Sequence, residues 1–585
     1  MKDETFFDYP VFDNIKQIIY HSVSKYPKNV AFRLKEKNGE EIKYIDITYT
    51  EFLEEINRLG TGFYSLGLKG KRVGIIAKNR YEWVLTYVTL LLGGIIAVPF
   101  DKGLTDVEIE NSILRSKIDA IVYEEKYEDI INKIKNEGKS NLTELICMDR
   151  VKDKRYIKDI VEIGKEKLDN GNKDYINCKI DDKALATLVF TSGTTSNSKI
   201  VMLSQYNIAR NISDMQLVED FRSTDINLAF LPMHHLFGST GQLIMLSSGI
   251  TTAFPDGLRY IAQNLKEYHI TFFVGVPILI EAIYKKLNEE IEKKGKTKVV
   301  RIAKVFTNLL LKLGIDIRRK VFKDIIDGLG GLRFVISGAA PLDKKVEKGF
   351  NDLGTLTVQG YGLTEASPVL CAENYKYRRY GSIGFPMKNV QIRVDSKDKN
   401  GIGELVFKAP NIMIGYYEDE EATKEAITKD GYFHSGDIGH VDSEGYVYIT
   451  GRIKNVIVTQ NGKNIYPEEI EGLLAKVPEI KECFVYGKAP EGEAAKKKDK
   501  MELIITARVI PNKDEIEKKY GKNLDEKQIY DIIWDKIKEV NKKLTSYKAI
   551  KALEIQEGEF EKTSTLKIKR YKEIQKDAKA VKSEK

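Results

Sequence analysis

The sequence predicts an α/β protein whose main domain is a largely parallel sheet structure covered by helices. Short apolar runs of strand length alternate with longer segments of helical periodicity. Such alternation is typical of layered α/β domains, because neighbouring parallel strands need a crossover connection that is usually a helix. The 585 residues allow about four domains at ~150 residues each, fewer if the domains are large, so we expect a large core.

The first elements follow from local patterns. Residues 12–27 have amphipathic helical spacing, and residues 31–34 begin a strand. Thr48 and Glu51 form the pattern of a capping box, which predicts a helix from there to about Gly60. The apolar runs predicted as further buried strands are 72–77, 120–123, 145–147 and 184–190.

One stretch, residues 83–100, approaches the ~20 apolar residues of a membrane-spanning helix. Gly93, Gly94 and Pro99 divide it, which predicts a helix of about three turns followed by a short strand. We therefore interpret it as a buried helix–strand unit rather than a span.

Composition indicates an ordinary globular protein. The net charge is +8, from 94 basic and 86 acidic residues, and this small excess does not indicate a nucleic-acid partner. The four cysteines are far apart and form no CxxC pair, so neither a zinc site nor a disulfide framework is predicted. The first residues lack the layout of a signal peptide, and we expect a cytoplasmic protein.

Residues 191–199 (TSGTTSNSK) follow a predicted buried strand and combine hydroxyls, one glycine and a lysine. Such a loop can bind phosphate, because the glycine permits close backbone approach, hydroxyls donate to phosphate oxygens and the lysine adds positive charge. The alternative is an ordinary Ser/Thr/Asn-rich turn. A P-loop is excluded, because Ser198 precedes Lys199 where that motif needs glycine and Ile200 follows it.

Later motifs carry their own chemistry. In residues 359–365 (QGYGLTE), Tyr361 can stack on a purine, Thr364 can donate to a phosphate and Glu365 can hold Mg²⁺. Asp437 can accept hydrogen bonds from both hydroxyls of a ribose. Adjacent side chains of an extended segment alternate in direction, so His234 and His235 are predicted to point to different sides, which disfavours a shared metal ion.

These motifs, with residues 451–455 (GRIKN) and 562–570 (KTSTLKIKR), resemble in type and order those of the acyl-adenylate-forming, AMP-binding synthetases, nearest the long-chain fatty acid–CoA ligases. The resemblance covers nearly the whole chain. It implies catalytic roles for His235, Thr364, Glu365 and Lys567, with Glu365 as the magnesium ligand. The implied ATP- and AMP-binding residues are Thr191, Ser192, Gly193, Thr194, Thr195, Lys199, Gly338, Ala339, Ala340, Gln359, Gly360, Tyr361, Thr364, Asp437 and Arg452.

The resemblance also implies the domain organisation: an AMP-binding domain of large multi-layered α/β type over residues 1–451, a hinge at 452–455 centred on Lys454, and a small mobile α+β domain over 456–585 that carries Lys567. The chain departs from the family pattern at six positions. These are Ser196, Ser198, Ile200, His434, Asn455 and Leu566.

The function implied is ATP-dependent activation of a fatty acid to acyl-AMP and transfer to CoA, with ATP, Mg²⁺ and CoA as cofactor, metal and co-substrate. Two alternatives stay open: an adenylating ligase whose acceptor is a carrier protein, and a non-catalytic nucleotide- or lipid-binding relative. Acyl chain length and oligomeric state are not specified by the sequence. Residues 285–326 predict basic amphipathic helices, either a solvated pair or a peripheral contact with the inner membrane surface.

Overall fold

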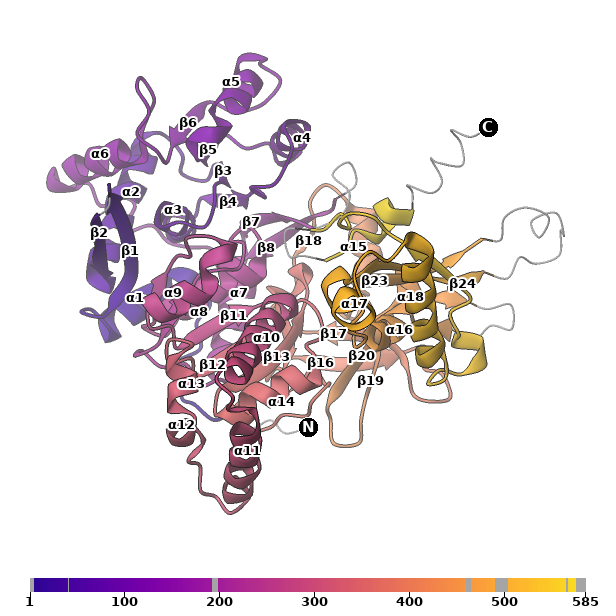
Figure 1. Ribbon diagram of the computed structural model, residues 1–585. Helices are drawn as coiled ribbons and strands as arrows, with labels where there is room; N and C mark the ends of the chain where they lie inside the picture. Colours follow the sequence, from indigo (N-terminus) through magenta and orange to yellow (C-terminus); the bar gives the residue numbers. More distant parts are fainter. Residues whose placement is uncertain are drawn as a thin grey trace. The chain divides into compact units, whose positions relative to one another are not determined.

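The computed structural model describes residues 5–39, 41–191, 198–458, 464–489, 503–563 and 567–574 (Figure 1). Contacts between Cα atoms divide the chain into two compact units. The first comprises residues 1–392, 407–433 and 443–447, and the second comprises 393–406, 434–442 and 448–585. The mixed α/β architecture, with a large N-terminal part and a smaller C-terminal part, confirms the predicted fold class.

Four strands that begin before the predicted boundary at residue 451 form one sheet in the order β16-β17-β19-β20, and most of their residues fall in the second unit. The boundary at 451 stays a prediction. The hinge at Lys454 stays a prediction. These strands are β16 (Gln391–Asp395), β17 (Gly403–Lys408), β19 (Phe433–Val441) and β20 (Val447–Arg452).

The first unit contains a nine-stranded sheet in the order β15-β14-β13-β12-β11-β9-β10-β1-β2. Its central neighbours, from β1 to β13, are all parallel, and the antiparallel pairs lie towards its two edges. The strands are β1 (Val30–Asn38), β2 (Glu41–Thr48), β9 (Ile226–Leu228), β10 (Thr251–Ala253), β11 (Phe272–Gly275), β12 (Phe334–Ser337), β13 (Leu356–Gly362), β14 (Val369–Ala372) and β15 (Phe385–Pro386).

A second sheet of the same unit has the order β18-β8-β7-β4-β3-β5-β6. The pairs from β7 through β4, β3 and β5 to β6 are parallel, while β7–β8 and β8–β18 are antiparallel. The strands are β3 (Arg72–Ile76), β4 (Ile96–Pro99), β5 (Ala120–Tyr123), β6 (Glu144–Cys147), β7 (Leu185–Phe190), β8 (Ile200–Ser204) and β18 (Gly415–Tyr416). The predicted strands at 72–77, 120–123, 145–147 and 184–190 are confirmed, each within a residue or two.

Helices connect these strands and contribute to two apolar cores. The predicted helix at 12–27 is confirmed, although shorter. The helices of the first unit are α1 (Ile15–Lys25), α2 (Tyr49–Ser65), α3 (Tyr81–Leu92), α4 (Asp106–Ser116), α5 (Glu128–Asn136), α6 (Ile157–Asp169), α7 (Gln205–Gln216), α8 (Leu236–Ser247), α9 (Ile261–Glu267), α10 (Pro277–Lys293), α11 (Thr297–Lys312), α12 (Arg318–Val321), α13 (Lys323–Asp327), α14 (Lys344–Leu353) and α15 (Glu420–Ala426).

Two helix boundaries follow directly from sequence. Both bonds of the predicted capping box form at the start of α2, between Thr48 and Glu51, and the helix continues beyond the predicted end to Ser65. At Gly94 φ is +61°, which L side chains rarely adopt, so the chain turns there from α3 into β4. The helix–strand unit predicted for residues 83–100 is thus confirmed. In the described part of the chain, no helix has the length and apolar character needed to cross a bilayer.

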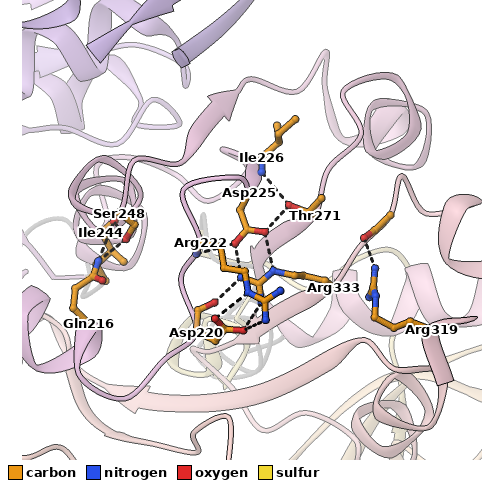
Figure 2. Close-up of polar contacts among 11 residues, drawn as sticks. Gln216, Asp220, Arg222, Asp225, Ile226, Ile244, Ser248, Thr271, Arg319 and Arg333 are labelled. Carbon is orange, nitrogen blue, oxygen red and sulfur yellow. Dashed lines mark hydrogen bonds and ion pairs between the residues drawn. The ribbon is translucent and has the colours of Figure 1, made fainter. Parts of the chain in front are cut away.

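An ionic cluster joins the amino-terminal ends of β9, β11 and β12 (Figure 2). Arg333, just before β12, donates to both carboxylate oxygens of Asp225, just before β9. The hydroxyl of Thr271, just before β11, donates to the same carboxylate at 2.8 Å. Asp225 is 2% exposed, so its charge needs these partners. The cluster therefore holds three parallel strands in register at the edge opposite their carboxyl ends.

The second unit also contains a three-stranded sheet in the order β23-β24-β25, a two-stranded ribbon, and helices that pack around an apolar core. Its α+β character agrees with the expectation for the C-terminal part. These elements are β21 (Ile457–Val458), β22 (Asn464–Ile465), β23 (Ile480–Lys488), β24 (Ile504–Pro511), β25 (Ala552–Ile555), α16 (Pro467–Leu474), α17 (Lys513–Tyr520) and α18 (Glu526–Asn541).

Candidate active site

Three of the sequence-predicted motifs lie at one edge of the nine-stranded sheet. Strands β9, β11, β12 and β13 are parallel neighbours, so their carboxyl ends share that edge. Residues 338–340 follow β12, residues 359–361 lie in the last half of β13, and His235 follows β9 after a short loop. The carboxyl edge of parallel strands is where α/β proteins bind ligands. Topology therefore brings together motifs that lie far apart in the sequence.

The predicted adenine edge, residues 338–340, is shaped by close packing. A Cβ atom at Gly338 would lie 2.6 Å from the ring of Phe237 in α8, which is closer than real contacts allow. Ala339 has φ of +73°, an uncommon conformation for a residue other than glycine. Strained backbone of this kind often marks ligand-binding sites. Ala340 is exposed to solvent at this edge.

Both polar groups of the Gln359 side chain form hydrogen bonds with other residues of the protein. Its carbonyl accepts from Leu342 N at 2.8 Å, and its amide donates to Glu347 at 2.9 Å. Its backbone N–H donates to Glu373, a buried carboxyl whose pKa is raised by desolvation and by the neighbouring Glu347. Through these hydrogen bonds Gln359 holds the last half of β13 in place. A nucleotide contact through it stays a prediction.

Tyr361 lies two residues further along β13. The rings of Tyr361 and Phe407 lie 5.9 Å apart in a tilted arrangement. Tyr361 is only partly buried, as stacking on a purine would require.

The prediction that His234 and His235 point to different sides is wrong. Their rings lie 4.4 Å apart, and His234 Nε2 lies 3.2 Å from the carboxylate of Asp101, after β4. The reason is local: the two residues form a turn before α8 rather than an extended segment, so alternation does not apply. One ligand atom from each of the three residues lies within 4.8 Å of the others, a geometry able to hold a metal ion.

His235 is the residue immediately before the first turn of α8. The amino end of a helix carries partial positive charge, which favours a carboxylate. A small cavity of about 20 Å³, partly open to solvent, lies beside this helix and is lined mainly by apolar side chains. Its lining residues are Asn227, Leu228, Ala229, Phe230, Leu231, Met233, Phe237, Gly238, Gly241, Gln242, Met245 and Val274.

The phosphate-loop motif connects two antiparallel strands rather than a strand and a helix. Thr191 N–H donates to the carbonyl of Lys199 at 2.9 Å, which closes the loop between β7 and β8. Residues 192–197, with predicted ligands Ser192, Gly193, Thr194 and Thr195, lie outside the described residues.

Two departures from the family pattern have structural partners. Arg115 of α4 donates to the hydroxyl of Ser198 at 3.1 Å and to its carbonyl at 2.6 Å. Ile200 is buried, begins β8 and joins an apolar core. The Ser198 hydroxyl and the Ile200 side chain thus both make contacts, at positions where the family pattern has Pro and Gly. Ser196 and Leu566 lie outside the described residues.

Tyr416 links the lysine of the phosphate loop to the predicted magnesium ligand. The ammonium of Lys199 lies 4.3 Å from the centroid of the Tyr416 ring. The Tyr416 hydroxyl donates to the Glu365 carboxylate at 2.9 Å, and desolvation raises the pKa of this tyrosine, with the Glu365 charge adding to the effect. No local sequence signal indicates this role of Tyr416, because Lys199 and Glu365 lie far from it in the sequence.

Glu365 lies in a 3₁₀ turn, Thr364–Ala366, directly after β13. Its carbonyl accepts a hydrogen bond from Met413 N at 2.8 Å, which holds the backbone in place. A carboxylate and the neighbouring Thr364 hydroxyl are hard oxygen donors, which Mg²⁺ prefers together with phosphate oxygens. The residues present thus fit the metal that the sequence predicts.

In the second unit, the predicted ribose ligand Asp437 lies on β19 and is almost fully buried. Arg452, at the end of β20, donates to it with Nε at 2.6 Å and Nη2 at 3.3 Å. Ser435 accepts the Asp437 backbone N–H at 3.0 Å. Asp437 and Arg452, both predicted to bind the nucleotide, are therefore brought together by neighbouring strands, although they lie 15 positions apart in the sequence.

Lys567 belongs to the same electrostatic group. Its pKa is lowered to about 8, first by desolvation and then by the positive charge of Arg452, while Asp437 opposes the shift. Lys567 as a whole residue is exposed, but its ammonium is desolvated, and this desolvation lowers its pKa. Its backbone N–H donates to Thr563 Oγ1 at 3.1 Å, which closes the turn that presents the side chain. Perturbed lysines of this kind are common at catalytic sites.

Lys454 is exposed in a 3₁₀ turn, Ile453–Asn455, that directly follows β20. Asn455 replaces the aspartate of the family pattern, and its amide donates to Glu468 at 2.5 Å. An aspartate there would face a second carboxylate, so the neutral amide suits this chain.

A model of the family described as AMP-binding enzyme matches residues 19–417, well over half of the chain. The nucleotide-site motifs at one sheet edge and the lysine with lowered pKa agree with that match. The chain belongs to this family and is an acyl-adenylate-forming ligase, as the sequence resemblance predicted.

Two relatives from Arabidopsis thaliana illustrate the range of acceptors. A chloroplastic long-chain-fatty-acid–[acyl-carrier-protein] ligase, AEE15, is 25% identical over 83% of this chain and 76% of its own length. Long chain acyl-CoA synthetase 4 is 27% identical over 82% of this chain and 77% of its own length.

Solved structures support the fold. ATP-bound MatB from Rhodopseudomonas palustris has a TM-score of 0.73 at 22% identity, covering 96% of this chain and 97% of its own. An anthranilate CoA ligase, AuaEII, in complex with anthranoyl-AMP also has a TM-score of 0.73, at 18% identity, covering 97% of each chain.

Proposed function

We propose that this enzyme activates a long-chain fatty acid with ATP and transfers the acyl group to CoA. The proposal rests on two contacts of Tyr416. Its ring lies against the ammonium of Lys199, and its hydroxyl donates to the carboxylate of Glu365. A cation and a carboxylate that both contact one tyrosine fit a bound Mg–triphosphate, because Lys199 suits phosphate oxygens and Glu365 suits the metal. A protein that only bound lipid would not need this pairing.

In the first step, a carboxylate oxygen of the acid attacks the α-phosphorus of ATP. The bond from that phosphorus to the bridging oxygen breaks, acyl-AMP forms and pyrophosphate leaves. Bound magnesium would neutralise phosphate charge in this step. Lys199, Lys567 and the amino end of α8 with His235 are proposed to align the reactants and stabilise developing charge.

In the second step, the CoA thiol gives its proton to solvent water as its sulfur attacks the acyl carbon, and AMP leaves with the electron pair of the broken bond. Lys567 is proposed to act in the first step and to leave before the second. Rotation about Lys454 is proposed to allow this exchange, because a hinge needs only one or two residues with free backbone dihedrals.

The acyl group is proposed to enter the apolar pocket beside α8. Its lining favours binding of a hydrocarbon chain over binding of a polar acyl group, since the side chains of Leu228, Phe230 and Met245 form no hydrogen bonds. The four cysteines are free, which supports a reducing location such as the cytoplasm.

A carrier protein is the second candidate acceptor. The 25% identity to a long-chain-fatty-acid–[acyl-carrier-protein] ligase is the observation that favours it. Among the described residues, no contact distinguishes the two acceptors. Both share the phosphopantetheine thiol, so the first step is the same.

The test is pyrophosphate release from MgATP by the purified full-length protein, with short, long and aromatic acids. Each acid is measured alone, with CoA and with a phosphopantetheinylated carrier protein. The expected result is release that is greatest with long-chain acids and turns over repeatedly only with CoA. Lys199→Ala serves as the inactive control.

Other outcomes discriminate among the alternatives. Turnover with the carrier protein but not with CoA identifies the other acceptor. Turnover greatest with a short or aromatic acid contradicts the substrate proposal. ATP binding without release by any acid supports the non-catalytic relative.

A further inference from the structure

Helix α11 is anchored to the first unit along one face. Val300 and Ala303 pack against the core beneath it, and Thr307 is fully buried. On the same face, Lys304 Nζ donates to a backbone carbonyl of α14 at 3.3 Å, and Asn308 donates to Asp352 at the end of α14 at 2.8 Å. The helix is therefore held in a defined orientation (Figure 1).

The opposite face of α11 is apolar and has no cover within the described residues. Six large apolar side chains there are between 55% and 70% exposed. Five of them recur at intervals of three and four residues, which places them in one line along a helix. We call this set the outer stripe: Val299, Ile302, Val305, Phe306, Leu309 and Leu313.

Lone exposed apolar residues are ordinary, but a contiguous set of this kind marks an interaction surface. All of the stripe except Leu313 lies on α11, a helix of 16 residues that is about 24 Å long at 1.5 Å per residue, and Leu313 directly follows the helix. It continues into the turn after the helix, where Ile315 is 51% exposed.

Positive charge surrounds the outer stripe. Lys298, Arg301 and Lys312 of the helix are all exposed. The segment 296–323 contains a single acidic residue, Asp316, which pairs with Arg318. Its nine basic residues are Lys296, Lys298, Arg301, Lys304, Lys312, Arg318, Arg319, Lys320 and Lys323.

We propose that α11 docks this protein on the surface of a bilayer that contains anionic lipid. The outer stripe would lie among the acyl chains at the headgroup boundary, and the flanking lysines and arginine would contact phosphates. An apolar face flanked by basic residues is the pattern of helices that lie in the membrane interface. Docking on a bilayer involves no reaction, so this proposal does not depend on which acid the enzyme activates.

A second copy of the chain is a poorer occupant of this face. A twofold dimer through the same patch would bring the basic flanks of both copies together. Like charges at close range oppose association, whereas anionic headgroups neutralise them. Charge complementarity therefore favours lipid.

The experiment measures co-sedimentation of the full-length protein with vesicles of phosphatidylcholine alone, or mixed with phosphatidylglycerol. Binding is expected with the mixed vesicles, and it should weaken between 0.05 M and 0.5 M salt because salt screens headgroup attraction. Neutral vesicles are expected to bind the protein weakly.

Two sets of variants separate the contributions. Phe306→Asp with Leu309→Asp is expected to reduce binding to mixed vesicles at least tenfold, because two charges enter the acyl boundary. Lys298→Glu with Arg301→Glu should reduce it by about fivefold for each basic residue lost. Val107→Asp on α4 is the matched control, since Val107 is 67% exposed and belongs to no such stripe.

Circular dichroism and pyrophosphate release confirm that each variant is folded. Equal vesicle binding by the wild type and the stripe variant overturns the proposal, as does no binding to either vesicle. A concentration-dependent dimer that the stripe variant abolishes, measured by sedimentation without lipid, would assign the face to a second copy instead.

Discussion

The hydroxyl of Tyr416 donates a hydrogen bond to the carboxylate of Glu365, with the two oxygens 2.9 Å apart. The tyrosine belongs to a two-residue strand, β18, whereas Glu365 lies in a turn beyond the other sheet. The contact thus crosses between the two sheets of the first unit, and it fixes the direction of a side chain expected to hold Mg²⁺.

Tyr416→Phe should raise the Mg²⁺ concentration needed for half-maximal adenylation by roughly tenfold or more, since partners that orient a metal ligand commonly contribute that much. The measurement is pyrophosphate release at increasing Mg²⁺ and saturating ATP. Tyr417→Phe is the matched control, because the Tyr417 hydroxyl accepts from Arg72 instead. An unchanged Mg²⁺ requirement in Tyr416→Phe would sink the positioning role.

Lys567→Ala should abolish acyl-AMP formation, by about 100-fold or more, because it removes a cation proposed to stabilise the transferring phosphoryl charge. Thioester formation from supplied acyl-AMP should continue. Lys569→Ala is the control, since Lys569 is paired with Glu561 at 3.2 Å. Equal loss of both half-reactions would contradict the assignment.

The lowered pKa of Lys567 predicts a pH-dependent reactivity. Below pH about 8 the ammonium is protonated, and above it the neutral amine should react with acetic anhydride in the absence of nucleotide. Arg452→Ala removes a repelling charge and should move the labelling midpoint up. Asp437→Asn removes an attracting charge and should move it down. A midpoint near 10.5, or both variants shifting it the same way, would be incompatible with this electrostatic group.

Lys454→Pro should slow thioester formation while leaving adenylation intact, because proline fixes φ and removes the backbone donor at the proposed hinge. Single-turnover measurements of each half-reaction test this. Lys454→Ala keeps the backbone freedom and is expected to retain both. The hinge assignment fails if adenylation is the half-reaction that collapses.

Arg333→Ala should destabilise the first unit by roughly 3–5 kcal/mol, because it leaves the buried Asp225 carboxylate without its cation (Figure 2). Urea unfolding followed by fluorescence measures the change. Lys323→Ala removes an exposed ion pair with Asp327 and should leave the urea midpoint nearly unchanged. Similar midpoints for both variants would show that the buried cluster contributes little.

Local patterns predicted much of the fold. The capping box of Thr48 and Glu51 forms, and the paired glycines at 93 and 94 end one helix before the next strand. These features depend on residues within one or two turns of each other, so they can be read along the chain. The motif order also identified the family, because the spacing of whole motifs is retained even where single residues change.

Tertiary contacts decided what neighbouring residues do. His234 and His235 converge because they form a turn, which their mere adjacency did not indicate. Ser198 and Asn455 depart from the family pattern, and their partners Arg115 and Glu468 belong to other elements.

The sequence by itself thus determined the fold class and the family, and it predicted which side chains carry the chemistry, because these depend on residue type and order. Only the tertiary structure decided that Tyr416 joins Lys199 to Glu365, since these residues lie on separate strands and turns. It also decided which face of α11 is covered. Periodicity predicts an amphipathic helix, but the packing of α14 against one side leaves the other apolar side open.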